Sequence, residues 1–323
     1  MITVRDKSGE YGDCAYEYLG FERFVSKSED VMFYGYQTPY NQQVKEYFKD
    51  YKRKIFLQGE QPCGLCSTVP HILQQSLRVA DYFDEVYSTC PYSAEWLNTV
   101  NGYDKYRAIC FPHSTEYAVT DMHEKPLDVI YWGNVPDGSR NSAIVLNILE
   151  AMTKFNSAFY TLGIGVPQRY HSLVTGVNVP RTQMWETLRK SKVMVTANLL
   201  YLTDQEVQAT KTCPMWEKNE AFNMLDHNIM PQIKTRPIEA IFNKTLVVLK
   251  EDPWRIFDRW FKPEEDFLYY KNDEDLEPLL RNISNDWDSY KHIAENAYNK
   301  AMQHYTCKRT FEMIKNKELF NVK

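Results

Sequence analysis

The sequence lacks an excess of positive charge, a long apolar run and a regular pattern of cysteines. Its 323 residues carry 38 Lys and Arg against 43 Asp and Glu, so the formal net charge of -5 gives the whole chain no electrostatic footprint for nucleic acid. No apolar stretch approaches the roughly 18 residues that a membrane span needs. The first residues, MITVRDKSGEYGD, do not have the composition of a signal peptide. We therefore expect a soluble, cytoplasmic protein without a membrane span.

The seven cysteines are odd in number and scattered, which is not the pattern of a disulfide framework in a chain of this length. Cys63 and Cys66 have the two-residue spacing of a metal knuckle or a redox pair. A zinc site would need a second pair of ligands, and no matching CxxC or HxxxH follows. We therefore expect reduced thiols and no metal site.

Short strand-like runs alternate with amphipathic stretches along the whole chain. The first third contains strand-like runs, rich in β-branched and aromatic residues, at 2–4, 31–36, 54–58, 85–89 and 107–111, with helix-like stretches at 42–54 and 71–84. A second series has strands at 127–132, 158–165, 192–198 and 245–249, helices at 141–155 and 182–190 with Thr182 as a plausible N-cap, and final helices at 275–283 and 287–305. This alternation predicts parallel sheets with helices on both faces.

The fold class that follows is α/β, with two Rossmann-like doubly wound domains facing each other across a cleft. The chain exceeds the usual size of a single core, and the polar segment 114–126 has the composition of an interdomain connection. We place an N-terminal domain at residues 1–120 and a C-terminal domain at 121–323, whose last helices pack back toward the N-terminal domain. Ligands of such sheets lie beyond the carboxyl ends of the strands, so the site should lie in strand-to-helix loops.

The loop GNVPDGSR, residues 133–140, is the first such loop in the second series. Gly133 and Gly138 permit close approach of the backbone, and Ser139 can cap a helix. Arg140 stands where the helix amides begin, so the loop is suited to an anion. An ordinary glycine-rich turn with a solvated arginine explains the same residues, and the glycines of 163–172 fit ordinary strand-to-helix punctuation.

The stretch IKTRPIEAIFNKTLVVL, residues 233–249, has a similar position before a strand. If a helix begins near Pro237, Lys234 and Arg236 face the same side as its first amides and could hold a diphosphate. Glu239 only accepts hydrogen bonds, so its natural partner is the pair of hydroxyls of a ribose. The alternative is a surface pair between Arg236 and Glu239, which is common on helices and contributes little.

The order of these segments resembles the C-terminal donor-binding domain of the group 1 type of GT-B glycosyltransferases. The resemblance covers roughly residues 127–305 and is strongest over 233–283, where an Arg and a Glu begin the helix before TLVVL, and FLYY precedes the acidic KNDEDLEPLL. It implies that Glu239 binds the nucleotide ribose, that Arg236 and Arg140 contact the diphosphate, and that Gly133 lines the donor loop. It also implies a UDP- or GDP-linked sugar donor, no cofactor and no required metal.

Two positions depart from the family pattern. Gln232 stands seven residues before Glu239, where many retaining members have a second Glu, so retention or inversion of stereochemistry is open. Asn243 and Lys244 replace the small glycine that is common just after the helix. The N-terminal half matches the family only in the order of strands and helices, so the acceptor, a glycan or another hydroxyl compound, is open as well.

A glycosyltransferase of the inverting type needs a general base for the acceptor hydroxyl, and in this fold the base comes from the N-terminal domain. Three residues follow predicted strands there, namely Glu60, Asp13 and His113, with Glu60 and Asp13 ranked first. A structural role is the alternative for each of them.

Three other functions compete with a hexosyl- or pentosyltransferase. A Rossmann dehydrogenase would need GxGxxG right after the first strand, where DKSGEYGD stands instead. A non-catalytic module that binds nucleotide sugars would use the same donor site without turnover. A phage-type glycosyltransferase that acts on modified DNA bases is disfavoured by the negative net charge.

Overall fold

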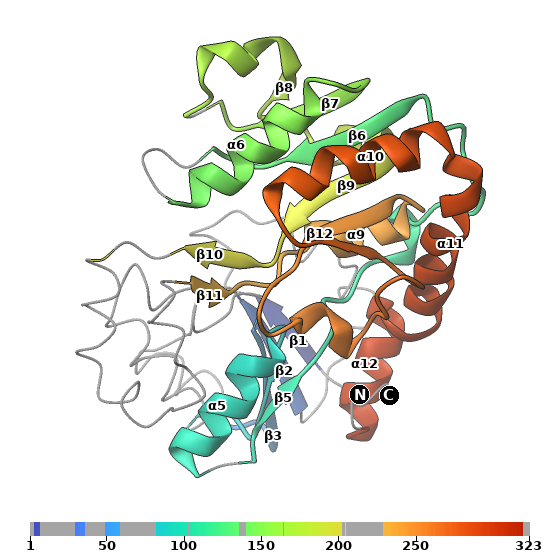
Figure 1. Ribbon diagram of the computed structural model, residues 1–323. Coiled ribbons are helices and arrows are strands. Elements are labelled where there is room, and N and C mark those ends of the chain that lie inside the picture. Colours follow the sequence, from blue (N-terminus) through green and yellow to red (C-terminus); the bar gives the residue numbers. More distant parts are fainter. Residues whose placement is uncertain are drawn as a thin grey trace. The chain divides into compact units, whose positions relative to one another are not determined.

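The computed structural model describes residues 3–6, 30–35, 49–58, 82–102, 104–135, 140–163, 165–201, 204 and 229–318 (Figure 1). The chain forms two compact units. Unit 1 consists of Met1–Ser114, Leu202–Ile233 and Tyr305–Lys323, and unit 2 consists of Thr115–Tyr201 and Lys234–His304. The first unit is therefore built from three separate segments of the sequence, and the second from two.

Unit 1 contains a parallel sheet whose five strands follow one another in sequence order. The strands are β1 (Thr3–Asp6), β2 (Asp30–Gly35), β3 (Arg53–Gln58), β4 (Glu85–Ser88) and β5 (Tyr106–Ala108). All five predicted strands are confirmed, although the last is shorter than 107–111. The helices α5 (Pro91–Asn101) and α12 (Cys307–Asn316) and the short strand β11 (Ile229–Pro231) were not predicted. The helices expected at 42–54 and 71–84 lie largely outside the described residues.

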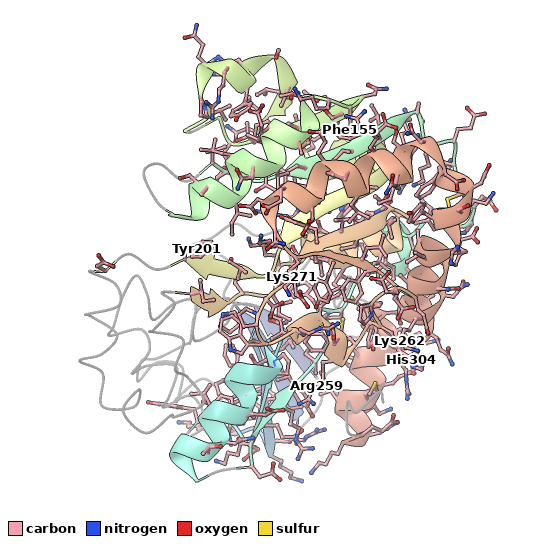
Figure 2. All side chains as sticks on the ribbon, viewed as in Figure 1. Phe155, Tyr201, Arg259, Lys262, Lys271 and His304 are labelled. Carbon is pink, nitrogen blue, oxygen red and sulfur yellow. The ribbon has the colours of Figure 1, made fainter. Side chains whose placement is uncertain are left out.

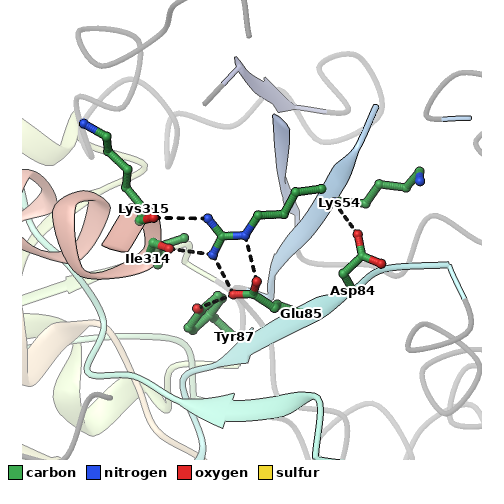
Figure 3. A network of polar contacts seen from close by, with 7 residues as sticks. Lys54, Asp84, Glu85, Tyr87, Ile314 and Lys315 are labelled. Atoms are coloured by element: carbon green, nitrogen blue, oxygen red, sulfur yellow. Dashed lines mark hydrogen bonds and ion pairs between the residues drawn. The ribbon is translucent and has the colours of Figure 1, made fainter. Parts of the chain in front are cut away.

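Arg53 ties α12 to the sheet of unit 1, and its partners Glu85 and Ile314 are labelled in Figure 3. Its Nε and Nη2 atoms each donate to the Glu85 carboxylate over 2.7 Å, and Nη2 also donates to the carbonyl of Ile314 over 2.6 Å. Burial alone would raise the pKa of Glu85, but hydrogen bonds from Arg53 and Tyr87 and the arginine charge lower this pKa below its ordinary value. A charged pair thus closes the carbonyl end of a helix that lies more than 200 residues further along the chain.

Unit 2 contains a six-stranded parallel sheet with the order β13-β12-β9-β6-β7-β8. Its strands are β6 (Leu127–Trp132), β7 (Ser157–Thr161), β8 (Val174–Val177), β9 (Ser191–Ala197), β12 (Leu246–Lys250) and β13 (Leu268–Tyr270). Its helices are α6 (Arg140–Met152), α7 (Arg181–Arg189), α9 (Arg236–Phe242), α10 (Leu276–Asn285) and α11 (Trp287–His304). Short additional elements are η3 (Thr115–Tyr117), η4 (Gln168–Leu173), β10 (Leu199–Tyr201), η6 (Ile256–Arg259) and η7 (Asp273–Asp275).

Helices cover both faces of the six-stranded sheet (Figure 1). The helices α6 and α10 contact each other and β9, and α10 also contacts β6, while α7 and α9 contact each other and β9. Alternate residues of the central strands point to the α6 and α10 side and form the core with them, for example Val129, Val193 and Leu246. Phe155, labelled in Figure 2, packs against the same core just after α6. The near-continuous burial of β6, β9 and β12 is that of a sheet covered on both faces.

Two details of unit 2 differ from the prediction. Residues 174–177, for which no strand was predicted, form the edge strand β8, which pairs with β7. Thr182 is not the N-cap of α7, because the helix begins at Arg181 and Pro180 occupies the cap position without a side-chain hydrogen bond. The other predicted strands and helices of this half are present, with ends that shift by up to four residues.

The strand order of unit 2 reverses beside β6. The chain continues from β6 to β7 and β8 on one side, and then returns to place β9, β12 and β13 on the other. This is a topological switch point, and ligands of such sheets lie at the carboxyl ends of the strands next to it. The loops after β6 and β9 are therefore the first place to look for a site.

Candidate functional site

The start of α9 lies at the carboxyl ends of β6 and β9. The backbone N–H of Lys234 donates to Asn198 Oδ1 over 3.3 Å, which joins the approach to α9 to the residue just after β9. The guanidinium of Arg236 lies against Gly133, the residue just after β6. Residues 36 or more positions apart thus meet at the switch point.

Gly133 is required by this close approach. A Cβ atom at this position would lie 2.6 Å from Arg236 Nη1 and 2.8 Å from the Tyr131 hydroxyl, and the backbone φ of 153° is one that other residues rarely adopt. The Arg236 guanidinium also lies 5.9 Å from the centre of the Tyr131 ring. Burial raises the pKa of Tyr131, and the neighbouring Arg236 opposes this rise, so the phenol stays neutral and able to donate.

Glu239 is the buried acid of the site, with 1% of its surface exposed. Arg181, the first residue of α7, donates from Nη1 to Glu239 Oε1. Burial raises the pKa of Glu239, while the charge and hydrogen bond of Arg181 and the charge of Arg236 act in the opposite direction. One carboxylate therefore lies under the influence of two guanidinium groups from different helices.

Several buried polar atoms at this edge have no hydrogen-bond partner among the described residues. They are Glu239 Oε2, Asn198 Nδ2, Thr196 Oγ1 and Asp252 Oδ2. Thr196 and Asn198 lie at the end of β9, and Asp252 lies two residues after β12. Because buried polar groups are nearly always paired in folded proteins, unpaired donors and acceptors gathered at one edge indicate the contact surface of a polar ligand.

Asp252 shows the cost of such a position. Its Oδ1 atom accepts hydrogen bonds from the backbone N–H of Trp254 over 3.1 Å and of Ile256 over 3.3 Å. Burial nevertheless raises the pKa of Asp252 to about 6. The carboxylate is thus held in a low-dielectric position with half of its accepting capacity unused.

The structure brings together four of the five predicted donor-site residues, Gly133, Lys234, Arg236 and Glu239. Arg140, the fifth, is the first residue of α6, and its side chain and loop residues 136–139 lie outside the described part of the chain. The alternative, a surface pair of Arg236 and Glu239, does not form: the ion pair of Glu239 is with Arg181, and the carboxylate is buried.

The catalytic candidates are described only in part. Glu60 and Asp13 lie outside the described residues, as do Cys63 and Cys66. His113 is 1% exposed and lies five residues beyond the end of β5, not at a strand end. Its backbone N–H donates to Tyr305 O over 3.2 Å, its carbonyl accepts from Cys307 N over 3.0 Å, and its ring Nδ1 lies 2.9 Å from Ser114 O.

Sequence reasoning missed Arg181 and Asn198 as members of the site. Arg181 begins a helix right after Pro180, which marks a helix start but does not reveal a carboxylate 58 positions away. Asn198 directly follows a buried strand, and a polar residue at a carboxyl strand end is the signal that could have found it.

Similarity to solved structures identifies the fold class. HepE from Anabaena, solved with UDP and glucose, has a TM-score of 0.62 at 9% identity, with 98% of this chain and 99% of that chain covered. Sucrose-phosphate synthase from Thermosynechococcus elongatus has a TM-score of 0.59 at 12% identity, with 93% of this chain and 77% of that chain covered. At such identities the likeness shows the fold alone, which is GT-B.

TarM, from S. aureus, has a TM-score of 0.56 at 13% identity, and the match covers 95% of this chain. This chain spans only 57% of the length of TarM. No curated protein matches the sequence. Among the described residues, no helix has the length and apolar character to cross a membrane.

The family model described as glycosyl transferase-like matches residues 146–316. The match contains α7, α9 and the strands β9 and β12, and therefore Arg181, Asn198, Arg236 and Glu239. It spans just over half of the chain. The chain therefore belongs to the glycosyl transferase-like family, of the group 1 type, and it has the GT-B fold.

Proposed function

We propose that this protein transfers a hexosyl or pentosyl group from a nucleotide-diphosphate sugar to a hydroxyl group of an acceptor, and that the edge around Glu239 binds the donor. UDP is the first nucleotide to test, because HepE and TarM have been solved with UDP. The acceptor is a glycan or another hydroxyl compound.

The ribose of the donor binds to Glu239. A single observation supports this assignment. The Glu239 carboxylate is buried, Arg181 donates a hydrogen bond to one of its oxygens, and the other oxygen has no partner among the described residues. A ribose hydroxyl is a neutral donor of the kind that such an oxygen needs. Because Glu239 is 1% exposed, the ribose reaches Oε2 only if a side chain that covers this oxygen shifts.

The diphosphate binds to Arg236, Arg140 and Lys234. Arg236 lies against Gly133, so a phosphate that approaches the backbone of the loop after β6 also meets a guanidinium. Helix α9 has only seven residues, so its dipole contributes little and the side-chain charges must balance the phosphates. On this basis the leaving diphosphate is stabilised by cationic side chains, and we propose that no metal ion is required.

The acceptor hydroxyl loses a proton during the transfer. Glu60, Asp13 and His113 remain the proposed general bases, with the two acids first. His113 is held by backbone hydrogen bonds on both sides of its Cα atom, which fixes its position but leaves its ring with a contact to Ser114 O. Substitution of each residue in turn, with single-turnover kinetics across pH, would identify the base.

A donor screen tests the proposal directly. The protein is mixed with UDP-, GDP-, ADP- and dTDP-sugars, and both the thermal midpoint and the hydrolysis of each donor are measured. A ligand that binds the folded state stabilises it by about 2.7 kcal/mol at a concentration 100 times Kd, so binding raises the midpoint by several degrees. The absence of a shift with every donor would contradict the site.

Glu239→Gln is the matching variant, because it removes the charge and keeps the shape. We expect the affinity for the bound nucleotide to fall about tenfold, the loss of one hydrogen bond to a charged group. Glu277→Gln, at an exposed position on α10 that pairs with Arg281, is the control and should bind as the wild type does. If Glu239→Gln bound the nucleotide with wild-type affinity, the proposal that the ribose binds to Glu239 would be wrong. Donor binding without any transfer would instead favour a non-catalytic module.

A further inference from the structure

Arg181 and Glu239 form a pair that the assignment of ribose to Glu239 does not explain. Arg181 is the first residue of α7 and Glu239 lies in the first turn of α9, so two helices each bring one member. The carboxylate is 1% exposed, and the arginine side chain is 33% exposed. The guanidinium also lies 6.0 Å from the centre of the Trp132 ring, at the end of β6.

The two oxygens of Glu239 have different roles in this arrangement. Oε1 accepts from Arg181 Nη1, whereas Oε2 has no partner among the described residues. A buried carboxylate is stable in its ionised form only when opposite charge and hydrogen bonds compensate for the lost water. If Arg181 were absent, Arg236 would be the remaining charge that acts on this carboxylate, and among the described contacts Arg236 influences it by charge alone, without a hydrogen bond.

Other charged groups near α9 have different partners. On the elements that pack against α9, Arg189 of α7 donates to Asn243 Oδ1, Lys192 of β9 pairs with Asp128, Lys250 of β12 pairs with Asp273, and Tyr298 of α11 donates to Val119 O. Lys244, just after α9, donates to Thr120 O over 2.7 Å. Among the described residues, the charges that act on Glu239 are therefore those of Arg181 and Arg236.

We propose that Arg181 is a positioning residue for donor binding: it holds Glu239 Oε1, so that Oε2 is presented to a hydroxyl of the donor ribose. This inference rests on the proposed role of Glu239 and adds a residue and a mechanism to it. Arg181 acts through the carboxylate and does not itself bind the phosphates. A direct contact between Arg181 and the diphosphate is the competing mechanism, and the two differ in which part of the nucleotide matters.

The decisive comparison uses two ligands. Calorimetry measures the affinities of UDP and of 2′,3′-dideoxy-UDP for the wild type, Arg181→Ala, Arg181→Lys and the control Arg281→Ala, whose arginine is exposed on α10. In Arg181→Ala, UDP should bind about tenfold more weakly, while dideoxy-UDP should bind as it does to the wild type. Arg181→Lys should recover most of the loss, because its charge can still reach Oε1.

The pH profile separates positioning from a purely structural role. Burial raises the pKa of Glu239, and loss of the Arg181 charge raises it further. The affinity of Arg181→Ala for UDP should therefore increase more steeply with rising pH than that of the wild type, and Arg181→Ala/Glu239→Gln should lose this extra slope. The Arg281→Ala profile should coincide with the wild-type profile.

Three results would overturn the inference. An equal loss for UDP and dideoxy-UDP would show direct contact with the diphosphate, and tighter binding in Arg181→Ala would show that the arginine covers the site. Zero coupling between Arg181→Ala and Glu239→Gln in the unfolding free energy of the ligand-free protein would show that the two side chains do not interact. Failure of the wild type to bind any nucleoside diphosphate is a different result, because it overturns the donor site as a whole.

Discussion

The two edges of the six-stranded sheet differ in whether their buried polar groups have hydrogen-bond partners. At the carboxyl edge, Thr196, Asn198, Glu239 and Asp252 each keep a polar atom without a partner among the described residues. At the amino edge, Thr245, Ser191 and Lys125 have hydrogen-bond partners, although burial lowers the pKa of Lys125 to about 7. There Thr245 Oγ1 donates to Leu188 O over 2.6 Å, Ser191 Oγ donates to Thr187 O over 2.8 Å, and Lys125 Nζ lies 3.4 Å from both Asn243 O and Thr245 Oγ1.

This difference in hydrogen bonding indicates that one edge contributes to stability and the other to ligand binding. A buried hydrogen bond contributes about 1 kcal/mol to stability, whereas a buried group left unpaired costs about 1 to 3 kcal/mol. The amino edge therefore stabilises the fold, and the carboxyl edge lowers its stability in exchange for groups that a ligand can satisfy. Polar substitutions should consequently destabilise the protein at the amino edge and leave it unchanged, or stabilise it, at the carboxyl edge.

The largest effect is expected at the amino edge with Asp128→Asn. Asp128 pairs with Lys192 over 2.8 Å, and both side chains are 17% exposed. Burial alone would raise the pKa of Asp128, but hydrogen bonds from Lys192 and Ser284 lower it below its ordinary value. The loss of this partly buried pair should lower the free energy of unfolding at pH 7 by about 3 kcal/mol, measured by urea denaturation.

The pH dependence provides a check with a definite sign. Because the folded state lowers the pKa of Asp128, its stabilisation is present above the ordinary pKa of an aspartate and is lost as the pH falls through the folded value. The difference between wild type and Asp128→Asn should therefore shrink below about pH 4. Asp288→Asn, which removes a fully exposed pair with Lys291, is the control and should change little at any pH.

The opposite sign is expected at the carboxyl edge with Asp252→Asn. Burial raises the pKa of Asp252 to about 6, so the folded protein binds a proton before the unfolded chain does. The wild type should gain stability as the pH falls from about 6 toward 4, and Asp252→Asn should not. The variant should be about 2 kcal/mol more stable than the wild type at pH 8 and equal to it near pH 4. A destabilised variant at pH 8 would contradict the comparison of the two edges.

The smallest effect comes from a matched pair of threonines. Thr245→Val removes a hydroxyl that donates to Leu188 O, and should destabilise the protein by about 1 to 2 kcal/mol. Thr196→Val removes a hydroxyl without a partner among the described residues, and should be neutral or slightly stabilising. Both sites are buried and both changes keep the volume, so thermal unfolding of the two variants measures the edges against each other. An equal loss of stability in the two variants would contradict the proposed difference between the two edges.

The strands of the second sheet could be predicted from the sequence because burial on both faces leaves a clear pattern. The run LDVIYW is apolar after Asp128 and the run TLVVL is apolar after Thr245, and these runs form β6 and β12. The edge strand β8 could not be predicted, because VTGV is short, is only half-buried and contains a glycine that strands disfavour. The helix α12 was missed because its ends depend on Thr306 as N-cap and on distant contacts with Arg53.

The candidate site could be located from the sequence but not completed. The loop after β6 and the start of α9 were predictable, because parallel sheets place ligands at carboxyl strand ends. The partner of Glu239 was not, since Arg236 is the nearer arginine in the sequence and Arg181 is 58 positions away. Only the packing of α7 beside α9 decides which guanidinium meets the carboxylate.

The division of unit 1 into three segments has a consequence for the order in which the protein folds during synthesis. Its amino-terminal strands leave the ribosome first, but Arg53 meets the carbonyl of Ile314 only after 261 further residues have been made. Domains that are continuous in sequence can fold as they emerge. In this chain β3 cannot form these contacts with α12 until α12 has been synthesised.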